Sequence, residues 1–261
     1  GAAEEWWLSS EPVRQWERAG VQLRGNATVA MGSVYLDETA MQRDTAATAQ
    51  AAFAALHEAI RAAGYPWLLR TWIYIGDIHR GAADDERYRQ FCVGRAEALS
   101  GRVQGPMELP AATAIGRPAG GGGSIHFIAA TQPGEAVENP RQTSAFDYPR
   151  RYGPRPPSFV RALRTPWNHL LVSGTAAVLG HDSQHPGDTA AQAAMTRDNI
   201  AALTTAAGDG PWRPEHSIVY VRDPADAAAA EVLGGEGGCT VLHGAICRRE
   251  LLLECEVLFA R

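Results

Sequence analysis

Two carboxylates lie close together near the end of the chain, in the segment LLLECEVLFAR at residues 251–261. The segment is rich in Leu, Val and Phe and predicts a β-strand. Side chains alternate between the two faces of a strand, so Glu254 and Glu256 share one face and an apolar stripe runs along the other. A partly buried carboxyl group has a raised pKa and can act as a general acid near neutral pH. The alternative is a solvated sheet face.

A second candidate for chemistry is the segment at residues 138–167, which is dense in proline, arginine and aromatic residues. Proline fixes the backbone, and arginine presents a flat fork of N–H donors that suits carboxylates. This pattern favours a loop that binds an anion, with Tyr148 as a further donor, over a rigid surface connector. Arg222, close to the end of the strand-like SIVYVRD, is another candidate cation, unless it pairs with Asp223 or Glu215 at the surface.

The motif formed by Ser173, Gly174 and Thr175 could offer backbone N–H groups and a hydroxyl to a carboxylate, because glycine allows close approach of the backbone. The alternative is a β-bulge at Gly174, with packing roles for its neighbours. Cys247 lies seven residues before Glu254. Taken alone, it is typical of a small buried hydrophobic residue.

The segment GHDSQHPGD at residues 180–188 raises the question of a metal site, because His181 and His185 are four residues apart. Pro186 and Gly187 indicate a loop rather than a helix, and no third ligand follows at a familiar spacing. We therefore expect no metal site and no cofactor. Asp188 is expected to cap the helix that follows.

The composition excludes several classes of partner. The chain has 261 residues and a net charge of −5, which gives no reason to expect nucleic acid or an anionic membrane surface. A local arginine cluster could still bind a small anionic substrate. No apolar run approaches the roughly 18 residues that span a bilayer, and no signal peptide is visible. The four cysteines are scattered without a Cys-x-x-Cys pair, so we expect a cytoplasmic location.

Two segments share one order of elements and must position these side chains. The first contains a hairpin at 21–38, a helix from Asp44 to Gly64, a strand at 67–78, a helix within 84–101 and strands at 111–116 and 124–131. The second contains a strand at 169–181, a helix at 188–208, a strand at 217–223, a short helix at 224–234 and the closing strand. The repeated order, with DTAATAQAA in one helix and DTAAQAA in the other, predicts an internal duplication.

The expected fold class is therefore α/β (α+β), with mixed β-sheets backed by helices. We expect an N-terminal lobe at residues 1–135, a connecting loop rich in Pro, Arg and aromatic residues at 136–168, and a C-terminal catalytic lobe at 169–261.

Several longer phrases resemble known families. VSGTAAVLGHDSQHPGDTAAQAAMTRDNIAAL and the closing Glu-x-Glu strand resemble the RidA-like superfamily, whose fold is similar to that of chorismate mutase. ENPRQTSAFDYPRRYGPRPPSFVRA, RYRQFCVGRAEAL and SGTAAVLGHDSQHPGD together resemble the chorismatases, from about Gly20 to the end. Chorismatases remove the enolpyruvyl side chain of chorismate in natural-product pathways. The resemblance implies two RidA-like / chorismate mutase-like lobes.

The resemblance also implies the roles of several residues. Glu254 corresponds to the general acid, which would protonate the terminal methylene carbon of the enol ether. Arg141 and Arg161 lie in the matching motif and are implied to bind the two carboxylates of chorismate. Cys247 resembles the branch of the family that makes 3-hydroxybenzoate, whereas Ala176 resembles the branch that hydrolyses chorismate to a trans-dihydroxycyclohexadiene carboxylate.

Because Cys247 adds a polarisable group beside the ring, we give it more weight and expect 3-hydroxybenzoate plus pyruvate as products, in secondary metabolism. The alternatives are a chorismate hydrolase, a RidA-like imine/enamine deaminase, and a binding module that kept the pocket without the chemistry. The expected state is a monomer or a small homo-oligomer.

Overall fold

Alternating apolar residues build the first sheet around the predicted hairpin. The computed structural model describes residues 7–234 and 237–261. In it, β2 (Val21–Gly25) and β3 (Val29–Leu36) pair antiparallel, and β4 (Trp67–Gly76), β5 (Ala111–Arg117) and β6 (Gly123–Ala130) follow along the chain. The spatial order is β1-β2-β3-β6-β4-β5-β14. Two strands that the sequence analysis did not predict, β1 (Arg14–Arg18) and β14 (Ala245–Ile246), lie at the edges.

The second sheet has the order β13-β12-β15-β9-β8-β7. Its predicted strands are β9 (His169–Thr175), β12 (Arg213–Val221) and β15 (Leu253–Ala260). The strands β7 (Glu135–Val137), β8 (Ala162–Arg164) and β13 (Cys239–His243) were not predicted, because each is short. A separate hairpin pairs β10 (Val178–Leu179) with β11 (Asp182–Ser183).

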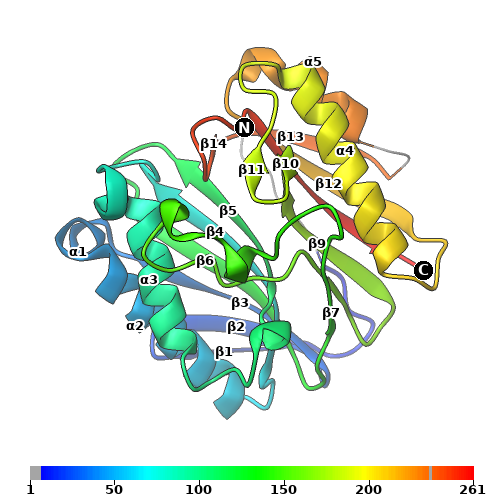
Figure 1. Cartoon of the computed structure of the whole chain (residues 1–261). Helices are drawn as coiled ribbons and strands as arrows, with labels where there is room; N and C mark the ends of the chain where they lie inside the picture. Colours follow the sequence, from blue (N-terminus) through cyan, green and yellow to red (C-terminus); the bar gives the residue numbers. More distant parts are fainter. Residues whose placement is uncertain (1–6, 235–236) are drawn as a thin grey trace.

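Helices cover the outer face of each sheet, as Figure 1 shows. In the first lobe these are α1 (Glu38–Arg43), α2 (Thr45–Ala62) and α3 (Arg87–Leu99), and in the second α4 (Thr189–Ala206) and α5 (Ala227–Ala230). The predicted caps are confirmed, because the Asp44 and Asp188 side chains accept hydrogen bonds from the third backbone N–H beyond them. The short last helix is interrupted by 3-10 turns on both sides. Within the described ranges, no helix is long and apolar enough to cross a membrane.

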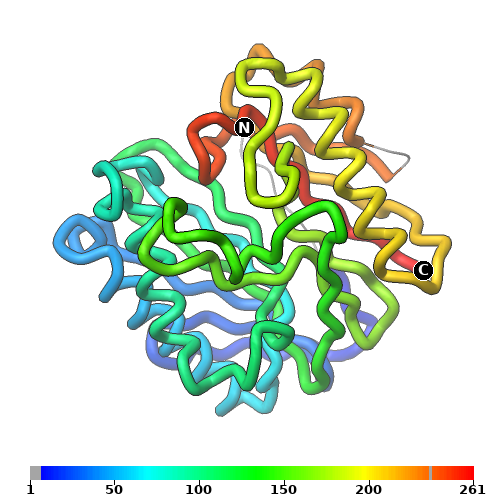
Figure 2. Tube along the Cα trace, viewed as in Figure 1, coloured from blue at the N-terminus to red at the C-terminus, as the bar shows by residue number. Residues whose placement is uncertain are grey.

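The predicted duplication is visible in the strand order. In the first sheet the order β2-β3-β6-β4-β5 places β6 antiparallel to both neighbours and β5 parallel to β4. The second sheet repeats this pattern as β8-β9-β15-β12-β13. In Figure 2 the blue-to-cyan and yellow-to-red parts of the chain lie in separate halves, apart from the red β14 segment that joins the first sheet. The expected α/β fold of two lobes with mixed sheets backed by helices is therefore confirmed.

A shared irregularity aligns the two lobes residue by residue. The pairing of β4 with β6 shifts register just before Arg70, and that of β12 with β15 shifts just before His216. Counting from these shifts, the positions of Glu254 and Glu256 in β15 correspond to Ser124 and His126 in β6. The two lobes thus have equivalent backbones but different side chains at the positions of interest.

The sheet faces without helices meet between the lobes. The apolar stripe of β15, from Leu253 to Phe259, packs in one core cluster with Ile200 and Leu203 of α4. The glutamates of β15 consequently point away from that helix and toward the first lobe, where the equivalent hydroxyls of Tyr74 and Tyr220 lie 3.0 Å apart. The predicted alternation of β15 is confirmed, but both glutamates are buried rather than solvated.

Gly94 allows α3 to pack closely on α2, and its replacement tests this contact. A Cβ atom at Gly94 would lie 1.9 Å from the backbone oxygen of Ala46. We expect Gly94→Ala to lower the free energy of unfolding by about 1–3 kcal/mol through overpacking, measured by urea denaturation with circular dichroism. Glu97→Ala, at an exposed position of the same helix, is the control and should stay within about 0.5 kcal/mol of the parent. Equal stability of Gly94→Ala and the parent would contradict the close packing.

Candidate active site

A cavity of about 350 Å³ lies between the two lobes and contains most of the predicted site residues. Its walls come from α3 and β5 of the first lobe, from the connecting segment, and from β9 and β15 of the second lobe. Its volume is at the lower end of the range typical of small-molecule sites, about 300–1,000 Å³. Of the ten predicted site residues, six line it: Tyr148, Arg161, Gly174, Ala176, Cys247 and Glu254.

Glu254 supplies the carboxyl group of the cavity. It is 5% exposed, and burial together with the nearby charge of Glu256 raises its pKa to about 8, against the opposing effect of three arginines. The group is therefore mostly protonated at neutral pH, as a general acid requires.

Gly174 makes room for this carboxyl group. A Cβ atom at position 174 would lie 2.0 Å from Oε1 of Glu254. The pairing of β9 with β15 also shifts here, because three steps along β9 match two along β15. Gly174 therefore marks a β-bulge, and its N–H donates to Oγ1 of Thr113 at 3.1 Å. The predicted contact of this N–H with a substrate carboxylate is replaced by a contact between the lobes.

Three arginine side chains with unused donors surround the cavity. Arg95, on α3, is 4% exposed, and its Nε and Nη2 have no hydrogen-bond partner among the described residues. Arg161 donates through Nη2 to the Thr143 carbonyl (2.8 Å) and to Oη of Tyr148 (2.6 Å), and its Nε has no partner in the same part of the chain. Arg248 likewise keeps a buried Nη2 that no described residue accepts from. Buried donors of this kind favour an anionic ligand.

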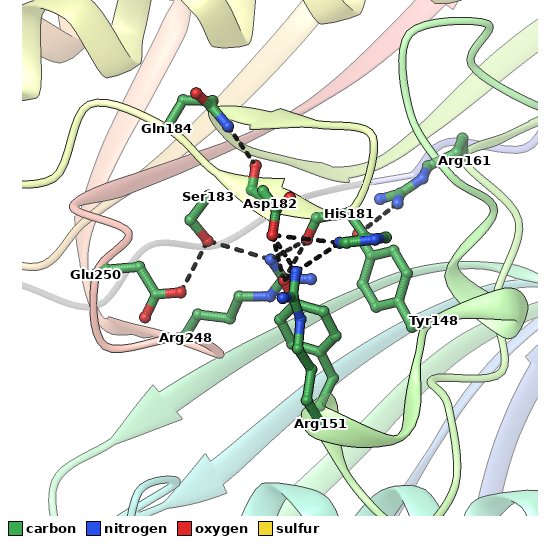
Figure 3. A network of polar contacts seen from close by, with 10 residues as sticks. Tyr148, Arg151, Arg161, His181, Asp182, Ser183, Gln184, Arg248 and Glu250 are labelled. Carbon is green, nitrogen blue, oxygen red and sulfur yellow. Dashed lines mark hydrogen bonds and ion pairs between the residues drawn. The ribbon is translucent and has the colours of Figure 1, made fainter.

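Aromatic rings and a polar network hold two of these arginines in place. The guanidinium of Arg248 lies 4.8 Å and 4.0 Å from the ring centroids of Tyr148 and Tyr152, and its Nη1 donates to the His181 carbonyl at 2.8 Å. Arg151 pairs with Asp182 on the same hairpin. Figure 3 shows these contacts converging beside the hairpin, with Arg161 directed at Tyr148. The connecting segment is thus a wall of the cavity and not a surface connector.

Cys247 contributes a neutral thiol. Burial and the proximity of Glu254 raise its pKa to about 12, so the sulfur keeps its proton over the physiological range. The Cys247 thiol therefore acts as a weak S–H donor and a packing group, not as a nucleophilic thiolate.

Four predicted ligands lie outside the cavity lining, each for a physical reason. Arg141 is 3.8 Å from Asp198 and its side chain is partly exposed. The hydroxyls of Ser173 and Thr175 are buried and donate to the backbone carbonyls of Val160 and Ser173. Arg222 donates to the carbonyls of Arg248 and Arg249, so it anchors the turn that carries Cys247 and Arg248. These four residues have structural roles.

The sequence analysis missed Arg95 and Arg248 as ligand candidates. A signal was available for Arg95, because Tyr88, Cys92 and Arg95 have the spacing of one helix face. Tyr88 and Arg95 indeed both line the cavity. Arg248 has no comparable signal, since its neighbour Arg249 has the same side chain and is 60% exposed.

Comparison with known proteins agrees with this site. The family described as "Chorismatase FkbO/Hyg5-like, N-terminal" matches residues 5–129. A chorismatase of Streptomyces rapamycinicus is 40% identical over 267 residues, which cover 94% of this chain and 76% of that protein. A 3-hydroxybenzoate synthase of Streptomyces hygroscopicus is 35% identical and covers 97% of this chain and 80% of its own.

Among solved structures, a chorismatase superposes with a TM-score of 0.86 at 33% sequence identity. The superposition covers 95% of this chain and 80% of that one, so it includes both lobes and the cavity between them. The identity, the coverage and the shared architecture lead to one conclusion: the chain belongs to the chorismatase family.

Proposed function

We propose that this chorismatase-family enzyme removes the enolpyruvyl side chain of chorismate and releases 3-hydroxybenzoate and pyruvate. The observation that carries the proposal is the protonated carboxyl of Glu254 in a cavity ringed by Arg95, Arg161 and Arg248. An acid and several cations in one small cavity fit a dianion that must be protonated to react.

The arginines supply the binding energy. Chorismate carries two carboxylates, and a guanidinium can donate two parallel N–H bonds to each. The buried donors of Arg95, Arg161 and Arg248 that lack a partner among the described residues are suited to this task. Tyr148, which accepts from Arg161 at 2.6 Å, has its hydroxyl proton left for the same anion.

Glu254 supplies the proton that starts the reaction. Its transfer to the terminal methylene carbon creates an oxocarbenium ion, and breaking the bond between the ring carbon and the ether oxygen then releases pyruvate. Aromatisation of the ring releases one proton, which restores the acid. The sum of 3-hydroxybenzoate and pyruvate has the atoms of chorismate, so the reaction balances without an oxidant or added water.

Hydrolysis is the second candidate, and one residue favours it. Ala176 lines the cavity and is 5% exposed. In the resemblance it matches the hydrolytic branch, in which one water is consumed and a dihydroxycyclohexadiene carboxylate leaves with pyruvate. Cys247 favours the aromatic product, as does the similarity to a 3-hydroxybenzoate synthase. Membership of the chorismatase family replaces the deaminase and binding-module alternatives.

Several expectations stay predictions. These are the cytoplasmic location, the monomeric or small homo-oligomeric state, the role in secondary metabolism, and the division of the chain at residues 135/136 and 168/169.

Replacing the acid tests the function directly. Glu254→Gln keeps the shape of the side chain but removes the transferable proton, so we expect pyruvate release from chorismate to fall by about 10²–10⁴-fold. Pyruvate is measured enzymatically, and circular dichroism checks the fold. Glu58→Gln, at an exposed side chain far along the sequence, is the matched control and should retain the parent rate. A normal rate in Glu254→Gln would exclude this glutamate as the acid, and no pyruvate from the parent would exclude the function.

The product branch is tested at two positions of the cavity. We expect Cys247→Val to shift the product from 3-hydroxybenzoate toward the non-aromatic diol, because the polarisable thiol beside the ring is lost. Ala176→Gly should shift it in the opposite direction. Chromatography of the ring product, normalised to pyruvate, gives the ratio. An unchanged ratio in both variants would show that these positions do not select the product.

A further inference from the structure

Glu256, which the sequence analysis left without a role, lies at the junction of the two lobes. It is 5% exposed and accepts hydrogen bonds from Nη2 of Arg70 at 2.7 Å and from Nε1 of Trp72 at 2.8 Å. Its third donor is Oγ1 of Thr113. Arg70 and Trp72 are on β4 and Thr113 is on β5, so all three donors come from the first lobe.

The polarity of these hydrogen bonds determines the state of Glu256. Oγ1 of Thr113 already accepts from Arg70 at 2.5 Å and from the Gly174 N–H at 3.1 Å, so its own proton points to Glu256. The two oxygens of Glu256 therefore face three donors, and only a carboxylate accepts from all of them. The junction holds a fixed negative charge.

This charge lies next to the acid. Glu254 and Glu256 are two residues apart on the same face of β15, opposite Tyr220 and Ile218 of β12. The charged and titratable groups that surround Glu254 come from every packed element: Glu256 on β15, Arg70 on β4, Tyr88 and Arg95 on α3, Arg161 before β8, Tyr220 on β12, and Cys247 and Arg248 in the turn before β15. Among these neighbours, Glu256 carries the negative charge, which makes loss of the proton from Glu254 less favourable.

Thr113 connects the same group to the other side of the acid. Its oxygen joins Glu256 to the N–H of Gly174, the residue whose missing side chain leaves space for the Glu254 carboxyl. The backbone of β9 at the bulge and the charge of Glu256 are thereby held by one hydroxyl. This arrangement fixes both the position and the electrostatic surroundings of Glu254.

We propose that Glu256 is a positioning residue of the active site, held by Arg70, Trp72 and Thr113 so that its fixed negative charge acts on the reaction through Glu254. The inference rests on the proposed role of Glu254 as acid. It adds that three residues of the first lobe, none of which lines the cavity, set the pH range in which the acid works.

The first test is the pH profile of kcat/KM for pyruvate release. In the parent, activity falls as pH rises through the raised pKa of Glu254, about 8. Glu256→Gln removes the negative charge and leaves Arg70 facing Glu254, so this alkaline limb should move to lower pH by about one unit or more. Arg70→Gln/Glu256→Gln removes both opposed charges and should give a limb between the two. Glu256→Asp, which keeps the charge, should restore the parent limb.

A second test does not depend on activity. Because the folded-state pKa of Glu254 lies above the ordinary value of 4.5, the folded state binds an extra proton between these values and loses stability as pH rises from 4.5 to about 8. The Glu254→Gln substitution removes this loss. Its advantage in urea midpoint over the parent should therefore grow with pH and level off near 8. In the Glu256→Gln background the plateau should begin about one unit lower.

The two tests separate the possible failures. If the parent releases no pyruvate, the proposed function fails, but the denaturation series still measures the effect of Glu256 on Glu254. If Glu256→Gln lowers activity equally at all pH values and leaves the plateau unmoved, Glu256 is only a structural ion-pair partner and the inference is overturned. Where Glu256→Gln alone unfolds because Arg70 is left unpaired, the double variant carries the same comparison.

Discussion

The ion pair between Arg70 and Glu256 joins the two sheets in a buried location, where an unpaired charge would be costly. The partners are 186 residues apart in the sequence, so the pair forms only when both lobes are folded and docked. Trp72 and Thr113 satisfy the remaining acceptor positions of the carboxylate and offset its desolvation. The alignment of the lobes, the bulge at Gly174 and the space around Glu254 all depend on this junction.

The cavity combines demands that normally conflict. Binding a dianion requires several guanidinium groups, but each guanidinium favours ionisation of a neighbouring carboxyl group and would abolish its acidity at neutral pH. Burial of Glu254 and the negative charge of Glu256 act in the opposite direction and are the larger effects. The arginines also make hydrogen bonds and ring contacts within the protein, which directs their charge toward the cavity walls.

Local patterns predicted the parts of this structure that depend on local sequence. Alternation assigned the two faces of β15, and Asp44 and Asp188 marked the starts of their helices. The same patterns failed for β13, β14 and Arg70, because short strands lack periodicity and because the partner of Arg70 lies in the other lobe. Arg141, Arg222, Ser173 and Thr175 have suitable side chains, but only the tertiary structure reveals that their polar groups are used elsewhere or directed away from the cavity.

The duplicated lobes are equivalent in backbone but not in charge. The positions that match Arg70, Glu254 and Glu256 hold His216, Ser124 and His126. In an assembly of identical subunits, every substitution appears in every copy, so a carboxylate suited to one site is imposed on all the others. Two lobes within one chain can evolve independently. The acid and its counter-charge are therefore placed on opposite sides of a single junction, and no symmetry-related copy of the glutamate pair has to be accommodated.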